Sequence, residues 1–342
     1  MMRFLLACLI ACAQLALSDG RLLAEIYRSP LQRAAAQGVV PPVVGQEQEP
    51  RSFLAVDSDI MVVRGDNYLG SKPQDTTKYP IVLLHGFLGW DQVFFVDYFF
   101  HIRKALEADG FTVYTPQVNP IATIETRAKQ LAPLLDRIFE QTGAAKINII
   151  AHSMGGLDAR YLIAHGYGDR IASLTTVGTP HHGTPVSDLI FGTLGQNNPL
   201  YKAFEFIAAS LLGKGSLKPS DLNFRDCLWN LSKSYAEDYF NQYYTDNPDI
   251  YYQSFAGVSS PTGIKSGDIM DLLLLPFAPA FKWGQRSDGM VTIESAKWGR
   301  FRGIVSADHV NLVGQLFGKT SSRFDHVKFY KKIAWELVDL GY

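Results

Sequence analysis

The chain has 342 residues, of which 47% are hydrophobic, and its 32 lysines and arginines nearly balance its 33 aspartates and glutamates, for a formal net charge of −1. This balance, without any polybasic run, excludes the basic footprint of a nucleic-acid-binding protein. The length and apolar fraction are ample for one sizeable hydrophobic core.

The N-terminus has the composition of a targeting segment. A short basic start, Met1-Met2-Arg3, precedes the apolar run Phe4 to Leu17, which is too short to cross a bilayer comfortably. We therefore expect residues 1–20 to be a signal peptide and the protein to be secreted. As an alternative, Leu9-Ile10-Ala11-Cys12 resembles a bacterial lipobox, which would leave the protein anchored through a lipidated Cys12. Residues 21–50 have no settled period and are interpreted as a leader or surface arm.

Only three cysteines are present, and two of them fall in the targeting segment. Cys227 therefore has no intramolecular partner, which excludes a disulfide within the mature domain. Asn230-Leu231-Ser232 is a glycosylation sequon that has meaning only in a eukaryotic secretory host, so glycosylation of Asn230 stays open.

Residues 51–342 alternate between strand and helix patterns and are predicted to form a single domain. The expected strands are 52–56, 60–64, 80–84, 111–115, 146–151, 172–178 and 251–257. The expected helices are 92–108, 123–141, 154–165 and 323–340. Strands separated by helices predict an α/β fold with a mostly parallel central sheet and helices on both faces. Active sites of such sheets lie at the carboxyl ends of the strands.

The alternation stops after Gly183, and residues 184–248 are predicted to be an inserted cap. Within it, residues 201–212 are amphipathic, with Phe204, Ile207, Ala208 and Leu211 on one face. This segment is either a normal cap helix or a lid that makes transient contact with a lipid surface. A second apolar run, Leu272 to Phe281, lines an apolar groove or belongs to the core.

The sequence Ile149-Ile150-Ala151-His152-Ser153-Met154-Gly155-Gly156 leads a β-branched run into a serine and then into a helical segment. This order is typical of a nucleophile elbow, in which a sharp turn lifts the serine hydroxyl above the sheet. Ala151 stands where the usual motif has glycine, and a methyl group still fits that position. We therefore expect Ser153 to be the nucleophile.

A nucleophilic serine also needs donors for the oxyanion. The buried-type strand before His85-Gly86-Phe87 ends in a turn of the kind that supplies one backbone N–H, and the residue after the nucleophile supplies the other. The expected donors are the backbone amides of Phe87 and Met154. His85 is expected to fix this loop rather than to carry protons.

The acid and the base are expected downstream, in the order Ser, Asp, His. Asp288 lies in a glycine-bearing turn, and His309 is the first histidine after it. Asp308 is the second candidate for the acid. It ranks behind Asp288 because the side chains of adjacent loop residues, such as Asp308 and His309, usually point apart. Three other histidines are expected to be non-catalytic: His181 and His182 at the rim of the site, and His326 in a surface or core position.

Together these motifs resemble the secreted α/β-hydrolase lipases of the Pseudomonas and Burkholderia type, and the Ala-His-Ser-Met-Gly-Gly elbow resembles that of small Bacillus lipases. The resemblance implies an α/β-hydrolase fold, a triad of Ser153, Asp288 and His309, and hydrolysis of acylglycerol esters at an oil–water interface. Whether a dedicated foldase assists folding is left open.

The same family holds a structural calcium that is not required for the chemistry. By resemblance, its ligands here would be Asp268, Asn311 and Gln315, with Asn311 replacing an aspartate and so reducing the charge of the site. Occupation by calcium and a plain hydrogen-bonded loop are therefore both open.

Other members of the fold use the same apparatus, so a short-chain carboxylesterase, a phospholipase and an acyltransferase remain alternatives to a triacylglycerol lipase. A catalytically dead hydrolase that acts as a binding module is the non-enzymatic alternative. The intact Ser, Asp and His set in the expected order argues against it.

Overall fold

A computed structural model describes residues 60–61, 76–89, 92–93, 96–190, 224–259, 274–282, 284–315, 318, 320 and 323–342. Several predictions from sequence lie outside these residues: the signal peptide, the leader, the expected strand 52–56, the possible lid helix 201–212 and the candidate ligand Asp268.

The core is a seven-stranded sheet in the order β1-β9-β8-β7-β6-β2-β5, and every neighbouring pair is parallel. Its strands are β1 (Ile60–Met61), β2 (Ile81–Leu84), β5 (Val113–Tyr114), β6 (Ile147–His152), β7 (Ile171–Val177), β8 (Tyr251–Gly257) and β9 (Arg300–Val305). All residues of β2, β6 and β7 are buried, as expected for strands covered on both faces. The predicted mostly parallel α/β sheet is confirmed.

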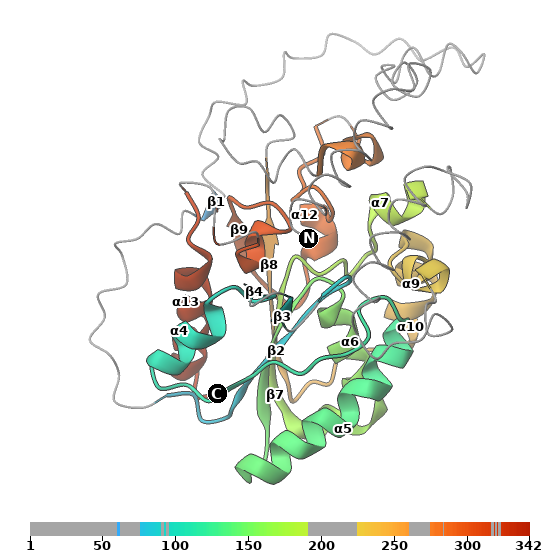
Figure 1. Ribbon diagram of the computed structural model, residues 1–342. Coiled ribbons are helices and arrows are strands. Elements are labelled where there is room, and N and C mark those ends of the chain that lie inside the picture. Colours follow the sequence, from blue (N-terminus) through green and yellow to red (C-terminus); the bar gives the residue numbers. More distant parts are fainter. Residues whose placement is uncertain are drawn as a thin grey trace, which may run out of the picture.

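Helices cover both faces of this sheet (Figure 1). On one face, α5 (Ile124–Thr142) and α6 (Gly155–Leu162) pack against side chains such as Val82 and Ile149. On the other, α4 (Ile102–Ala108) and α13 (His326–Asp339) pack against side chains such as Ile81 and Phe255. Alternate residues of a strand point to opposite faces, so Ile81 and Val82 belong to different halves of the core.

One predicted helix was wrong in its extent, and one strand was not predicted. The helix expected over 92–108 begins only at Ile102, because β3 (Gln92–Val93) and β4 (Val96–Asp97) form an antiparallel pair before it. The β-branched Val93 and Val96 of these strands favour extended backbone. Strand β9 was not predicted, because its sequence begins Arg-Phe-Arg-Gly and only its last two residues are buried.

Shorter helices lie between the strands, and one more follows β9. They are α7 (Pro185–Asp188), α9 (Phe224–Asn230), α10 (Asn241–Tyr243), α12 (Ile293–Ala296), the π-helices η1 (Ile163–Tyr167) and η5 (Tyr235–Phe240), and the 3₁₀-helices η2 (Gly168–Arg170), η6 (Leu275–Ala280) and η7 (Asn311–Val313). Among the described residues, no helix combines the length and apolarity that crossing a membrane requires.

The sequon residue Asn230 has a structural task in the described part of the cap. Its side chain is buried, and its Oδ1 accepts a hydrogen bond of 2.8 Å from the backbone N–H of Ile124, the first residue of α5. The first N–H groups of a helix have no partner within the helix, so Asn230 satisfies one of them. A glycan on this nitrogen requires Asn230 to leave the interior.

Candidate active site

Ser153 lies at the turn between β6 and α6, at the carboxyl edge of the sheet. Its φ of 54° is in the left-handed region, which is strained for a residue with a side chain. The turn is held by hydrogen bonds from the Ser153 N–H to the Val177 carbonyl (3.0 Å) and from the Thr179 hydroxyl to the Ser153 carbonyl (2.8 Å). These contacts stabilise a conformation that the local sequence alone disfavours.

Small residues surround Ser153 because the backbone segments approach closely. A Cβ on Gly155 would lie 2.8 Å from the carbonyl oxygens of Leu84 and His85, and a Cβ on Gly86 would lie 2.6 Å from the Ser153 Cβ. Ala151, the departure from the usual motif, is fully buried in β6, where its methyl group is accommodated.

The structure brings together Ser153, His309 and Asp288. The Ser153 Oγ lies 2.9 Å from the His309 Nε2, and the His309 Nδ1 lies 2.8 Å from the Asp288 Oδ2. The Asp288 Oδ1 accepts the N–H groups of Met290 and Val291 at 2.9 and 2.7 Å. The buried carboxylate therefore orients the imidazole, which leaves Nε2 free to accept the serine proton.

Asp308, the other candidate for the acid, has both carboxylate oxygens hydrogen-bonded to the residues that follow His309. Its Oδ1 accepts the N–H groups of Val310 and Asn311, and its Oδ2 accepts the Asn311 side-chain amide at 2.7 Å. Asp308 thus caps the short helix η7 that follows His309. The geometry favours Asp288 as the orienting group.

His85 fixes the loop after β2, as expected. Its Nδ1 lies 3.0 Å from the Gly86 carbonyl, and its Nε2 accepts the Val118 N–H at 3.2 Å. Burial, together with the positive charge of Arg127, lowers the pKa of His85 to about 3, so the ring is neutral near pH 7. The Gly86 carbonyl that His85 contacts belongs to the same peptide group as the Phe87 N–H.

Sequence reasoning missed a buried ion pair beneath this loop. Arg127 of α5 is fully buried and lies 2.8 Å from the carboxylate of Asp158 on α6. The same guanidinium donates to the carbonyls of His85 (2.8 Å) and Asn119 (2.9 Å). It ties the loop after β2 to the helix that follows the nucleophile. An arginine and an aspartate within amphipathic helices carry no sequence signal for such a pair.

Of the remaining histidines, His181 was placed wrongly at the rim. It is fully buried, its Nε2 lies 3.0 Å from the Thr176 hydroxyl, and its ring stacks on Trp298. His182 is half-buried beside the same tryptophan. His326 has the core position that was one of its two expected places, with its Nε2 3.0 Å from the Phe100 carbonyl.

Of the candidate calcium ligands, Asn311 and Gln315 are both buried in the segment that follows His309. The Gln315 Nε2 donates to the carbonyls of Asp97 (2.7 Å) and Tyr98 (2.6 Å), whereas its buried Oε1 accepts no hydrogen bond from any described residue. An amide oxygen without a hydrogen-bond partner is a suitable ligand for a hard cation such as calcium. The described residues include no group of three His, Cys, Asp or Glu side chains that could hold a metal.

Comparison with known proteins agrees with the fold. Residues 79–250 match the family model described as the alpha/beta hydrolase fold. The chain belongs to the α/β-hydrolase family. A triacylglycerol lipase of Vibrio cholerae is 31% identical over 78% of this chain and 89% of its own length, and one of Pseudomonas fragi is 29% identical over 78% and 98%. The crystal structure of Staphylococcus hyicus lipase, 21% identical, shares the fold with a TM-score of 0.54, covering 79% of this chain and 97% of that one.

In this α/β-hydrolase an apolar cluster lies beside the loop after β2. Val186, Ile190, Leu228 and Phe277 are buried in it, and Phe87 packs against them. Behind Met154, the thiol of Cys227 lies 3.8 Å from the methionine sulfur and is a free, buried cysteine. Part of the predicted apolar run 272–281 therefore packs beside the expected oxyanion donor.

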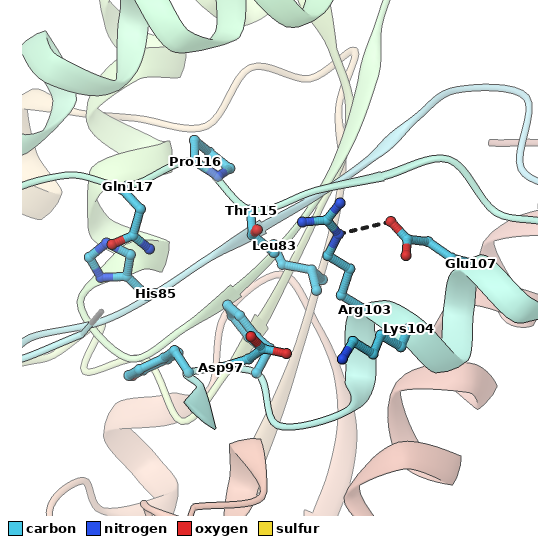
Figure 2. A pocket seen from close by; sticks show the side chains of 11 residues that line it. Leu83, His85, Asp97, Arg103, Lys104, Glu107, Thr115, Pro116 and Gln117 are labelled. Atoms are coloured by element: carbon cyan, nitrogen blue, oxygen red, sulfur yellow. Dashed lines mark hydrogen bonds and ion pairs between the residues drawn. The ribbon is translucent and has the colours of Figure 1, made fainter. Parts of the chain in front are cut away.

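A cavity of about 200 Å³ lies near the carboxyl ends of β2 and β5 and reaches α4 (Figure 2). Its wall includes His85, Asp97, Lys104 and the ion-paired Arg103 and Glu107. Ser153, Asp288 and His309 do not line it. Its charged wall does not suit an acyl chain.

Proposed function

We propose that this α/β-hydrolase is a triacylglycerol lipase that cleaves acylglycerol esters through an acyl-enzyme on Ser153. The observation that carries the proposal is the chain of hydrogen bonds from Ser153 to His309 to Asp288, built on a strained elbow. The similarity to triacylglycerol lipases of Vibrio and Pseudomonas supports this substrate class.

In the acylation step, the His309 Nε2 takes the proton of the Ser153 hydroxyl as the Oγ forms a bond to the ester carbonyl carbon. The carbonyl π electrons move to oxygen, and the resulting oxyanion accepts hydrogen bonds from the Phe87 and Met154 amides. The intermediate collapses, the carbon–alkoxy bond breaks, and the leaving alcohol takes the proton from His309. Asp288 stabilises the imidazolium while it exists.

In the deacylation step, the His309 Nε2 takes a proton from water, and the hydroxide oxygen attacks the acyl carbon. The bond to the Ser153 Oγ then breaks, the oxygen recovers its proton from His309, and a fatty acid leaves. Each step uses the same two amide donors, because the negative charge develops on the same oxygen.

We infer that the acyl chain contacts the edge of the apolar cluster beside Phe87, where some members are only partly buried. Leu228, Phe277 and the partly buried Met290 belong to it, and Met290 lies two residues from Asp288. Transfer of a long chain from water to such a surface is favourable by about 0.8 kcal/mol per methylene, which makes long-chain esters better substrates than short ones.

Two measurements test this proposal. Purified enzyme is treated with an alkyl fluorophosphonate, which labels an activated serine, and is then assayed on esters of increasing chain length, both dissolved and emulsified. Wild type and the exposed control Ser234→Ala should label and hydrolyse, whereas Ser153→Ala should fold but do neither. Turnover retained in Ser153→Ala contradicts the assignment, and turnover confined to short, dissolved esters indicates a carboxylesterase instead.

We also propose that Gln315 and Asn311, together with Asp268, hold a structural calcium that stabilises the His309 loop. The orphaned Gln315 oxygen supports this site. The ion supplies rigidity to the loop and no step of the chemistry. Calcium should raise the melting temperature of wild type after treatment with a chelator but not that of Gln315→Ala. Identical melting temperatures for wild type with and without calcium contradict the site.

Secretion through cleavage near residue 20, and a lid formed by residues 201–212 that covers the site in water, complete the proposal. The composition of the N-terminus and the amphipathic period of 201–212 support them. A mature N-terminus found by sequencing the exported protein, and activity that rises steeply when the substrate forms an emulsion, are the expected results.

A further inference from the structure

Tyr98 lies directly after β4, and its hydroxyl connects two parts of the site. The oxygen accepts the Gly86 N–H at 3.2 Å and lies 2.7 Å from the His152 Nδ1. A hydroxyl has one proton and two lone pairs, so it can accept the Gly86 N–H and at the same time hydrogen-bond the His152 Nδ1 in either tautomer of the imidazole. The side chain is 7% exposed, so water does not replace these partners readily.

Both partners of the hydroxyl adjoin the reacting groups. Gly86 immediately precedes Phe87, and His152 immediately precedes Ser153. The His152 ring centroid also lies 4.7 Å from that of His309. One hydroxyl therefore joins the expected oxyanion loop to the nucleophile elbow, at a point where the elbow contacts the base.

The peptide between His85 and Gly86 is held at both ends. The Arg127 guanidinium donates to its carbonyl oxygen at 2.8 Å, and the Tyr98 hydroxyl accepts from its N–H at 3.2 Å. The next peptide carries the Phe87 N–H. Rotation of the first peptide turns the second, so the direction of the Phe87 N–H depends on both anchors.

The backbone around Tyr98 is also fastened to the segment that follows His309. The carbonyl of Tyr98 accepts the Gln315 side-chain amide at 2.6 Å, and the Phe100 N–H donates to the Val313 carbonyl at 3.1 Å. The segment that positions the oxyanion loop therefore shares its support with the loop that carries the base.

We propose that Tyr98 is a positioning residue whose hydroxyl holds the Phe87 amide in line with the oxyanion and aligns the elbow beside His309. This inference rests on the proposed function, because it assigns Ser153 and Phe87 their roles. Preorganised donors contribute to the rate because they need not reorient as the charge develops. Loss of the hydroxyl should therefore lower kcat while KM changes little.

The chain supplies a matched control. Tyr330 is a fully buried tyrosine in the same hydrophobic cluster, and its hydroxyl has no hydrogen-bond partner among the described residues. Tyr98→Phe and Tyr330→Phe each remove one buried hydroxyl from that cluster. Only the first removes contacts to Gly86 and His152.

The experiment compares these two variants on a soluble p-nitrophenyl ester, with active sites counted by an alkyl fluorophosphonate and folding checked by thermal unfolding. Tyr98→Phe should lower kcat about 10- to 100-fold with KM within about threefold. An alkyl boronic acid, which forms a tetrahedral adduct on an activated serine, should bind more weakly by a similar factor. Tyr330→Phe should leave kcat and boronate affinity within about twofold.

An unchanged kcat in folded Tyr98→Phe, or an equal loss in both variants, overturns the proposal. If Tyr98→Phe does not fold, His152→Leu tests the same link from the other side. A loss of kcat with weaker boronate binding then supports the proposal, and unchanged values overturn it. Wild type that neither labels nor hydrolyses esters refutes the proposed function instead, so the two failures are distinguishable.

Discussion

Replacing each of two buried aspartates by asparagine separates the group that orients the imidazole from the group that supports its loop. In Asp288→Asn, the side-chain oxygen still accepts the N–H groups of Met290 and Val291, so an NH₂ group replaces the oxygen that faces the His309 Nδ1. That amide donates to Nδ1 and moves the ring proton to Nε2, where it points at Ser153. The base is then in the wrong tautomer.

The expected loss in kcat is about 10⁴-fold, the size seen when an orienting aspartate of such a triad becomes asparagine. This corresponds to about 5 kcal/mol of transition-state stabilisation. Because Asp288→Asn keeps the shape and both backbone hydrogen bonds, the free energy of unfolding should change by less than about 1 kcal/mol.

Asp308→Asn should give the opposite result. In this variant the side-chain oxygen still accepts the two backbone N–H groups. The new NH₂ group, however, faces the NH₂ group of Asn311, so that two hydrogen-bond donors meet without an acceptor. The free energy of unfolding should fall by about 1–3 kcal/mol, the cost of a buried unsatisfied group. kcat should fall by less than about tenfold.

Both variants are assayed on a soluble ester at a temperature where each is folded, and unfolding is followed in urea by fluorescence. Counting active sites by phosphonate requires an active base, so the protein concentration is taken from absorbance. A larger loss of kcat in Asp308→Asn than in Asp288→Asn refutes the assignment of the acid.

Three further predictions concern the supports of the site. Arg127→Met leaves Asp158 buried without its partner and should lower the free energy of unfolding by about 3–5 kcal/mol, whereas adding Asp158→Leu should restore part of this loss in urea titrations. Asn230→Ala should cost about 1 kcal/mol by freeing the first N–H of α5, and a loss near zero contradicts the capping role. Burial lowers the pKa of several histidines, and His85, His152 and His181 are the most deeply buried of them. Below about pH 6.5 the unfolded chain binds protons at these histidines that the folded protein does not, so stability should fall toward acid by at most about 1.4 kcal/mol per pH unit for each group. Urea midpoints that stay constant from pH 7 to pH 5 contradict this neutral burial.

Much of the fold was predictable because its signals are local. The runs before His85 and Ser153 are apolar and β-branched, and the helices between them have their own period, so a parallel sheet follows. The elbow was found because strand, serine and glycines are contiguous. Strand β9 was not found because its first residues are charged and partly exposed, and only pairing with β8 and β1 makes it a strand.

The sequence by itself determined which residue types are available for the chemistry and in what order they occur along the chain. Only the tertiary structure decided that His309, 156 positions after Ser153, faces its hydroxyl, and that Asp288 rather than Asp308 orients the ring. The tertiary structure also decided the contacts of Arg127 and Tyr98. Packing of α5 on α6 brings Asp158 to Arg127, and the meeting of two strand ends at the sheet edge brings Gly86 and His152 to Tyr98. Contacts between residues distant along the chain depend on the direction of each strand end, and no local pattern of residues encodes that direction.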